Sequence, residues 1–146
     1  MDKFDLQILD ILQKNGKISI AELGRLIGLS TTATKERVKK LEAEGVITGY
    51  VALVDGQKVG REVSAFITVP VGEMTIKDMG DRLSAIPEVV ECHKVTGNTC
   101  FLIKIIAKSP GNLERLVDAI NHYAKNTYTY LVLSTQKQTT YIDLNE

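Results

Sequence analysis

The hydrophobic positions at the start of the chain recur every three to four residues, which is the period of an amphipathic helix. Phe4, Ile8 and Ile11 share one face of a helix predicted over residues 3–14. Gly16 lies just beyond this segment, where a helix commonly ends. The chain therefore opens with a helix whose apolar face packs against other elements.

Two more helices follow, separated by a short turn. Ser19 and Glu22 are spaced as a capping box at the start of the second helix, and Gly28 is placed to end it. Ser30 is placed to cap the third helix, which is predicted over residues 31–44. Three helices with a glycine-containing turn between the second and the third are the pattern of a helix-turn-helix.

After the third helix the pattern changes from helical to extended. The segment GVITGYVALVD is rich in β-branched residues, which favours strands. Val46 and Ile47 are predicted to form the wing of a winged helix-turn-helix, and residues 50–54 to form a linking strand.

The rest of the chain alternates strands and helices in the order β-α-β-β-α-β. The segments are VSAFITVPV, TIKDMGDRLSAIP, VVECHKV, TCFLIKIIA, SPGNLERLVDAINHYA and YTYLVLSTQKQTTYI, the last with one or two closing strands. This order is that of a ferredoxin-like sandwich, in which two helices cover one face of an antiparallel sheet. The predicted fold class is α+β. The predicted domains are 1–49 (helix-turn-helix), 50–60 (linking strand and hinge) and 61–146 (ferredoxin-like).

Composition narrows the class of protein. The 146 residues are 44% hydrophobic and 25% charged, as in a globular domain rather than a disordered chain. No apolar run approaches the ~20 residues that span a bilayer, so no membrane partner is expected. The start MDKFDLQILDIL lacks the basic start and the small-residue cleavage site of a signal peptide. Two cysteines, Cys92 and Cys100, are too few for a disulfide framework. We therefore expect a cytoplasmic protein.

The formal net charge is zero, but the charge is not evenly spread. In LSTTATKERVKKLEAEG, Val38 and Leu41 fall on the inward side of the third helix. Lys35 and Lys39 fall on the opposite side, and Lys40 lies at its edge. The N-terminal part of such a helix enters the major groove of DNA, and residues further along reach phosphates. The residues predicted to bind DNA are Ser30, Thr31, Thr32, Lys35 and Glu36 at its start, followed by Arg37, Lys39 and Lys40 for the phosphates.

Two stretches of the sequence resemble one known family. LDILQKNGKISIAELGRLIGLSTTATKERVKKLEAEGVITGYVALVD is similar to the N-terminal half of the Lrp/AsnC, or feast/famine, regulators, and ECHKVTGN resembles their second half. The resemblance implies a DNA-binding transcriptional regulator whose reading helix is 31–44. It further implies a homodimer formed through the linking strand and the sheets, association of dimers into an octamer, and a small amino acid bound between dimers.

In the family this amino acid binds near the hairpin that here begins at Gly97, which makes Gly97, Asn98, Thr99 and Cys100 the candidate effector site. Many members have two acidic residues there, in a Gly-Asp-Tyr-Asp-like run, but this chain has GNTC. A buried ammonium group without an anionic or carbonyl partner is unfavourable. Asn98 and Thr99 still offer hydrogen-bond acceptors. An alternative is therefore a DNA-organising protein with the same fold and no effector.

Other chemistry finds little support in the sequence. Cys92 and His93 are neighbours on a predicted strand, so their side chains point to opposite faces, and no metal site is expected. A turn at Gly97 and Asn98 would pair Cys92 with Ile103 rather than with Cys100. No catalytic residue and no cofactor is predicted.

An enzyme is a further alternative. Some proteins on this two-domain plan resemble sirohaem decarboxylases, which need His and Arg in the second domain. The available residues here are Arg61, Arg82, Arg115, His93 and His122. Because an enzyme that had abandoned DNA would not need the basic third helix, the predicted function is that of a transcriptional regulator modulated by a small metabolite such as an amino acid.

Overall fold

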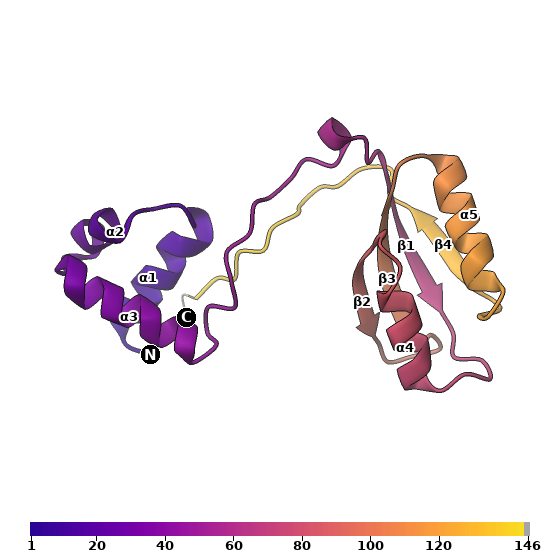
Figure 1. The fold of residues 1–146 in the computed structure, drawn as a ribbon, viewed down its shortest axis with the longest axis horizontal. Helices are drawn as coiled ribbons and strands as arrows, with labels where there is room; N and C mark the ends of the chain where they lie inside the picture. The colour runs from indigo at the N-terminus through magenta and orange to yellow at the C-terminus, as the bar shows by residue number, and fades with distance from the viewer. Residues whose placement is uncertain (145–146) are drawn as a thin grey trace. The chain divides into compact units, whose positions relative to one another are not determined.

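Two separate hydrophobic cores divide the chain. In the computed structural model, which describes residues 1–144, one unit comprises Met1–Leu53 with the segment that starts at Lys137, and the other comprises Val54–Gln136. The first is helical and the second is a sheet covered by helices, so the α+β fold class predicted from the sequence is confirmed (Figure 1). The functional boundaries at residues 49 and 60 stay a prediction, because compactness alone does not show which residues carry which function.

The N-terminal unit contains the three predicted helices. They are α1 (Lys3–Lys14), α2 (Ile20–Ile27) and α3 (Thr31–Ala43), and they meet in a core of Ile8, Leu9, Leu23, Ile27, Val38 and Leu41. The Ser19 hydroxyl accepts a hydrogen bond from the Glu22 N–H, and the Ser30 hydroxyl accepts one from the Ala33 N–H. Both predicted caps therefore fix where a helix starts.

The predicted capping box at Ser19 is only half formed. Instead of returning to the Ser19 backbone, the Glu22 carboxylate binds Arg25 one turn along α2, at 2.6 and 2.8 Å. A complete box is present where the sequence did not predict one, at the start of α1. There the Asp2 carboxylate accepts from the Asp5 N–H, and the Asp5 carboxylate accepts from the Asp2 N–H.

The predicted wing and linking strand do not form as strands in this chain. Residues 46–54 have no assigned strand, and the side chains of Val51 and Leu53 are each 83% exposed. A strand needs a hydrogen-bonded neighbouring strand. Here the Val46 and Ile47 N–H groups donate to the Leu41 carbonyl at the end of α3, and within residues 1–144 no strand is paired with residues 50–54. The wing and the linking strand therefore stay predictions, since the single chain shows this segment without a strand partner.

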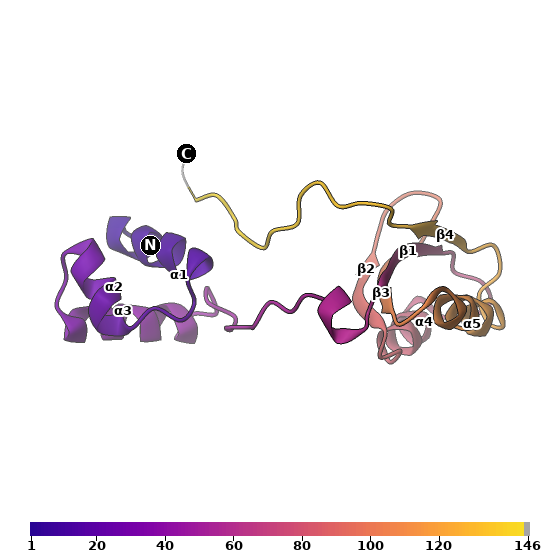
Figure 2. The same cartoon turned by 90° about the horizontal axis from the view of Figure 1, so that it is seen from above.

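The C-terminal unit is a four-stranded antiparallel sheet with two helices. Its elements are the short 3₁₀ turn η1 (Gln57–Val59), β1 (Val63–Val69), α4 (Ile76–Ser84), β2 (Val89–Lys94), β3 (Phe101–Ala107), α5 (Pro110–Asn121) and β4 (Tyr128–Leu131). The strand order is β2-β3-β1-β4, and both helices lie on the same side of the sheet (Figure 2). This is the predicted β-α-β-β-α-β arrangement.

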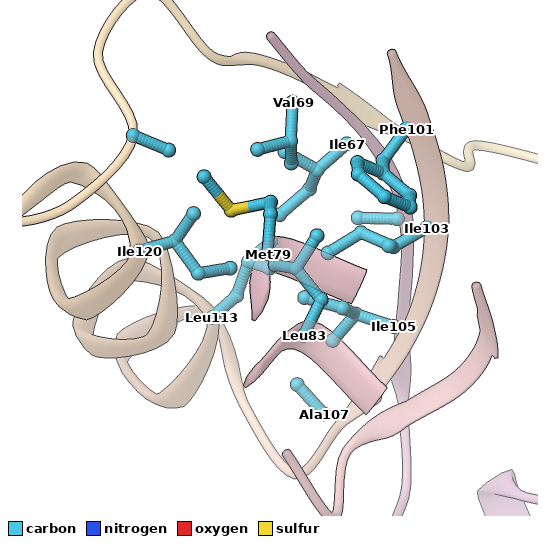
Figure 3. Packing of buried hydrophobic residues seen from close by; sticks show 12 residues of the cluster. Ile67, Val69, Met79, Leu83, Phe101, Ile103, Ile105, Ala107, Leu113 and Ile120 are labelled. Carbon is cyan, nitrogen blue, oxygen red and sulfur yellow. The ribbon is translucent and has the colours of Figure 1, made fainter. Parts of the chain in front are cut away.

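Alternating apolar residues of β1 and β3 build the second core. Ile67, Ile103 and Ile105 are fully buried and meet Met79 and Leu83 of α4 (Figure 3). Since neighbouring residues of a strand point to opposite faces, Phe66, Leu102 and Lys104 lie on the other side of the sheet, away from the helices. We call this side the open sheet face.

The β2–β3 hairpin has the predicted register. Cys92 pairs with Ile103 and Lys94 with Phe101, and the Val95 N–H donates to the Cys100 carbonyl, so the two cysteines are not cross-strand partners. Of the one or two closing strands predicted at the C-terminal end, the residues that the structure describes form one, β4.

The segment after β4 returns to α1 instead of adding a second strand to the sheet. The Gln13 amide donates to the Ile142 carbonyl at 3.0 Å and accepts from the Ile142 N–H at 2.7 Å, and the Tyr141 hydroxyl donates to Asp10 at 2.7 Å. Leu144 packs against the core of the three helices. The helical unit is thus linked to the sheet by two covalent connections, one on each side of the sheet domain in the sequence.

Candidate DNA-binding and effector sites

The third helix, α3, has one buried and one exposed face. Thr34, Val38 and Leu41 are at most 5% exposed and fasten it to the core, as the sequence predicted for its inward side. Seven of the eight predicted DNA-binding residues are exposed to solvent on α3 or at its N-cap. These are Ser30, Thr31, Thr32, Lys35, Glu36, Lys39 and Lys40.

A close approach between α2 and α3 sets the angle of the turn. A Cβ atom placed on Gly24 would lie 2.7 Å from the Thr34 hydroxyl and 2.8 Å from the Leu29 carbonyl oxygen, so only glycine fits. The Thr34 hydroxyl donates to the Ser30 carbonyl at 2.9 Å, which leaves this buried group satisfied. Gly28 ends α2 with φ of 75°, a left-handed conformation, as predicted.

The sequence did not predict the role of Gly24. A glycine inside an otherwise helical, well-patterned segment was the available signal, because it weakens the helix and is usually retained for packing. Together, Gly24 and Gly28 hold the start of α3 in a fixed place relative to α2.

The cations on the exposed face of α3 are available to bind a partner. Within residues 1–144, Lys35 and Lys39 make no hydrogen bond or ion pair. Lys40 lies 3.8 Å from the Glu44 carboxylate one turn along, and both side chains are at least half exposed. Exposed pairs of this kind contribute little to stability, so Lys40 is free to exchange Glu44 for a phosphate.

Arg37, predicted as a phosphate contact, differs from these lysines because its guanidinium already has partners within the chain. Its Nη1 donates to Asp2 and to Asp5, both at 2.8 Å, and its guanidinium carbon lies 5.3 Å from the centre of the Phe4 ring. The backbone N–H groups of the capping box, and then Arg37, lower the pKa of both carboxyl groups. Arg37 is therefore already bound to two ionised carboxylates, one in the first turn of α1 and one at its N-cap.

The candidate effector residues lie in the loop between β2 and β3. Gly97 has φ of 107° and Asn98 is exposed, while Thr99 and Cys100 are half-buried. Neither Asn98 nor Thr99 uses its side chain in a hydrogen bond within the described chain. Their polar atoms are therefore open to a ligand, although this single chain places no carboxylate in the GNTC run itself.

The cysteines have structural surroundings. Cys92 and Cys100 are free thiols that pack against the core of the sheet domain, whereas His93 points to the other side and lies 3.2 Å from Glu91. Over residues 1–144, no group of three or more His, Cys, Asp or Glu side chains is arranged to hold a metal ion. Among the helices of this same range, none has both the length and the apolar character to cross a membrane.

The open sheet face is a mixed apolar and charged surface. Cross-strand pairing aligns Lys104 of β3 with Glu91 on one side and Phe66 on the other, and Phe66 with Tyr130. The Lys104 ammonium lies 3.1 Å from the Glu91 carboxylate and 5.9 Å from the centre of the Phe66 ring. At the β4 edge, Tyr130 is 58% exposed. Both helices of the sheet unit lie on the other side of the sheet, so neither covers these aromatic groups.

Comparisons with known proteins cover both units. Residues 1–48 match the family model described as winged helix-turn-helix DNA-binding, and residues 64–142 match the Lrp/AsnC ligand binding domain. The chain is 40% identical over 135 residues to YezC, an HTH-type transcriptional regulator of Bacillus subtilis, with 92% of this chain and 95% of YezC covered. It is 32% identical over 150 residues to the leucine-responsive regulatory protein of Haemophilus influenzae, with 99% of this chain and 90% of that protein covered.

A solved structure is similar over the same extent. The transcriptional regulator NMB0573 of Neisseria meningitidis, in complex with L-Met, superposes with a TM-score of 0.93 at 29% identity, covering 99% of this chain and 97% of that one. The fold and the order of the two units are therefore shared with these regulators from end to end.

Proposed function

The chain belongs to the Lrp/AsnC family of DNA-binding transcriptional regulators, and on this premise we propose that it reads DNA through α3 as a homodimer. Its relatives are named as regulators of transcription, and it is a regulator rather than an enzyme. The observation that carries the proposal is the exposed face of α3, where unpaired cations stand opposite a buried anchor.

The start of α3 is the part assigned to the bases. Thr31, Thr32, Lys35 and Glu36 lie in its first two turns, which in a helix-turn-helix face the major groove. Lysine donates to guanine O6 and N7, and a threonine methyl or hydroxyl contacts thymine or other base edges. Lys39 and Lys40 lie further along and are assigned to phosphates, while Arg37 is removed from that set because its guanidinium is occupied.

We expect the two kinds of lysine to behave differently when replaced. Lys35→Ala should weaken binding to a selected site by about 1–3 kcal/mol and relax the preference at one base position, because a base contact is lost. Lys40→Ala should weaken binding to all sequences alike and reduce the dependence on salt. Site selection from random DNA and affinity titrations at several salt concentrations measure both. Unchanged affinity and preference in both Lys35→Ala and Thr32→Ala would mean that another element reads the DNA.

Self-association is the second part of the proposal. A two-fold dimer presents two reading helices to half-sites about one helical turn, ~34 Å, apart. The open sheet face, with Phe66 and the exposed Tyr130, offers apolar area for a second copy. The extended residues 50–54, unpaired in one chain, offer backbone groups for a strand of that copy. Association of dimers into an octamer stays a prediction from the family resemblance.

An amino-acid effector is the third part. The sheet domain is of the Lrp/AsnC ligand-binding kind, and the similar NMB0573 is a complex with L-Met. In this chain we assign the ligand to Gly97, Asn98, Thr99 and Cys100, where the side chains of Asn98 and Thr99 make no hydrogen bond within residues 1–144. Because the run lacks carboxylates, the ammonium group of a ligand would bind neutral acceptors, and we expect modest affinity.

Calorimetric titration with the twenty amino acids should therefore give heat with at least one of them. Asn98→Asp should raise the affinity for that amino acid about tenfold, because a charge-assisted hydrogen bond to the ammonium group replaces a neutral one. If no amino acid gives heat in protein that still binds DNA, the effector-independent, DNA-organising alternative is favoured instead. The observation that favours this second candidate is the absence of acidic residues from the GNTC run.

A further inference from the structure

The contacts of Arg37 form a bridge between the reading helix and the start of α1. The Asp2 carboxylate uses Oδ1 to cap α1, accepting from the Phe4 and Asp5 N–H groups at 2.9 and 3.0 Å, and uses Oδ2 to bind Arg37. The Asp5 carboxylate uses Oδ2 for the Asp2 N–H and Oδ1 for Arg37. Each carboxylate therefore holds the helix end with one oxygen and the guanidinium with the other.

This bridge is more directional than the packing around it. The apolar core between the helices is held by contacts that have no preferred direction, whereas hydrogen bonds between a guanidinium and carboxylates fix both distance and orientation. Asp5 is buried and its side chain is 8% exposed, so this partner cannot move aside easily. The Phe4 ring lies against the same guanidinium. Arg37 is thus fixed by three residues of the first turns of α1 and its cap.

The same contacts argue against Arg37 as a phosphate ligand. A move to DNA would leave two carboxylates with pKa values below the ordinary range, and hence ionised, without their cation. One of them, Asp5, would remain buried, and an unpaired buried charge is strongly unfavourable. The two carboxylates together with Arg37 carry a net negative charge, which the DNA backbone would repel.

We propose that Arg37 is a positioning residue that sets where α3 lies relative to α1, and thereby the base preference of the protein, without touching DNA. This rests on the proposed function of α3 as the reading helix. Lys35 is two residues before Arg37 on the same rigid helix, so a shift at Arg37 is carried directly to the base-reading turns. Loss of the bridge leaves the cations of α3 in place but no longer aligned with the bases.

A positioning role and a phosphate contact predict opposite changes in the ratio of specific to non-specific affinity and in the salt dependence of binding. A lost phosphate contact weakens specific and non-specific binding alike, and lowers the slope of log affinity against log salt by about 0.9. A lost positioning contact lowers the ratio of specific to non-specific affinity and leaves the slope unchanged. We expect this ratio to fall about tenfold.

The experiment compares four variants with the unmodified full chain. Arg37→Gln removes the charge, Arg37→Lys keeps the charge but not the planar fork that bridges two carboxylates, and Asp2→Asn removes one partner while keeping a residue that caps helices well. Lys40→Ala is the matched control for an exposed phosphate contact. Affinities for a selected site and for random DNA are measured over a series of salt concentrations, at a temperature where circular dichroism shows each variant folded.

We expect a lowered specificity ratio with an unchanged salt slope in Arg37→Gln, Arg37→Lys and Asp2→Asn. In Lys40→Ala we expect an unchanged specificity ratio with a lowered salt slope. A reduced slope with an unchanged ratio in Arg37→Gln, together with wild-type binding by Arg37→Lys, would overturn the proposal in favour of a phosphate contact. An unchanged ratio and slope in folded Arg37→Lys would also overturn it, leaving a role in stability alone. Because the unmodified protein is measured in parallel, its failure to bind DNA would instead count against the proposed function.

Discussion

Gly24→Ala is expected to abolish specific DNA binding, although the residue is buried and lies on α2 rather than on the reading helix. The added Cβ would lie 2.8 Å from the Leu29 carbonyl oxygen, which is backbone and cannot turn away, and 2.7 Å from the Thr34 hydroxyl. Relief requires α3 to move away from α2. Overpacking of this kind destabilises a domain by about 1–3 kcal/mol. The higher helix propensity of alanine offsets roughly 1 kcal/mol of this. Because the Leu29 backbone cannot move aside, we expect the net effect of Gly24→Ala on stability to be unfavourable.

The loss of affinity for the selected DNA site should exceed, in free energy, the loss of folding stability. A displaced α3 no longer aligns Thr32 and Lys35 with the bases, so affinity for a selected site should fall toward the non-specific level, lower by about 10³ or more. Gly111→Ala is the matched control, since a Cβ there meets nothing within 4 Å. Thermal unfolding and DNA titration measure the two effects. If the Gly24→Ala protein bound the selected site with the affinity of the unmodified protein, the geometry of the turn would not be required for specific binding.

Tyr130→Asp is expected to convert the protein to a 16.1 kDa monomer and to weaken DNA binding about 10²-fold or more. Tyr130 is 58% exposed on β4 and pairs across the strand with Phe66 of the open sheet face, so a carboxylate is tolerated in a single chain. In the proposed dimer the same carboxylate would be buried against an apolar partner surface, which is unfavourable. Binding then rests on one helix-turn-helix instead of two.

The neighbouring residue on the same strand provides the control. Thr129 pairs with the buried Ile67 and therefore belongs to the opposite side of the sheet, and Thr129→Asp adds the same charge at an exposed position. Light scattering coupled to gel filtration gives the mass of each variant. A dimer in Tyr130→Asp, or a monomer in both variants, would contradict self-association through the open sheet face.

The parts of the fold that the sequence predicted are those determined by neighbours along the chain. Ser19 and Ser30 cap helices through N–H groups three residues away, and Gly28 ends α2 through its own backbone conformation. The register of the β2–β3 hairpin followed in the same way from the turn at Gly97. Local signals of this kind are complete within a few residues.

The parts that the sequence did not predict depend on partners far along the chain. Arg37 binds residues 32 and 35 positions away, and Gln13 binds Ile142, 129 positions away. A basic residue on an amphipathic helix carries no mark that distinguishes a phosphate contact from an internal ion pair, so Arg37 was grouped with Lys39 and Lys40. The extended residues 50–54 were predicted as a strand because of their composition, but a strand also needs a neighbour.

The assignment of α3 as the reading helix is tested most directly by a crystal structure of the protein bound to a DNA fragment obtained by site selection. We expect two copies to bind, each with α3 in the major groove. We expect Thr32 and Lys35 within hydrogen-bond distance of base edges, and Arg37 still bound to Asp2 and Asp5. A complex in which α3 lies outside the groove, with another element against the bases, would contradict the assignment of α3 as the reading helix.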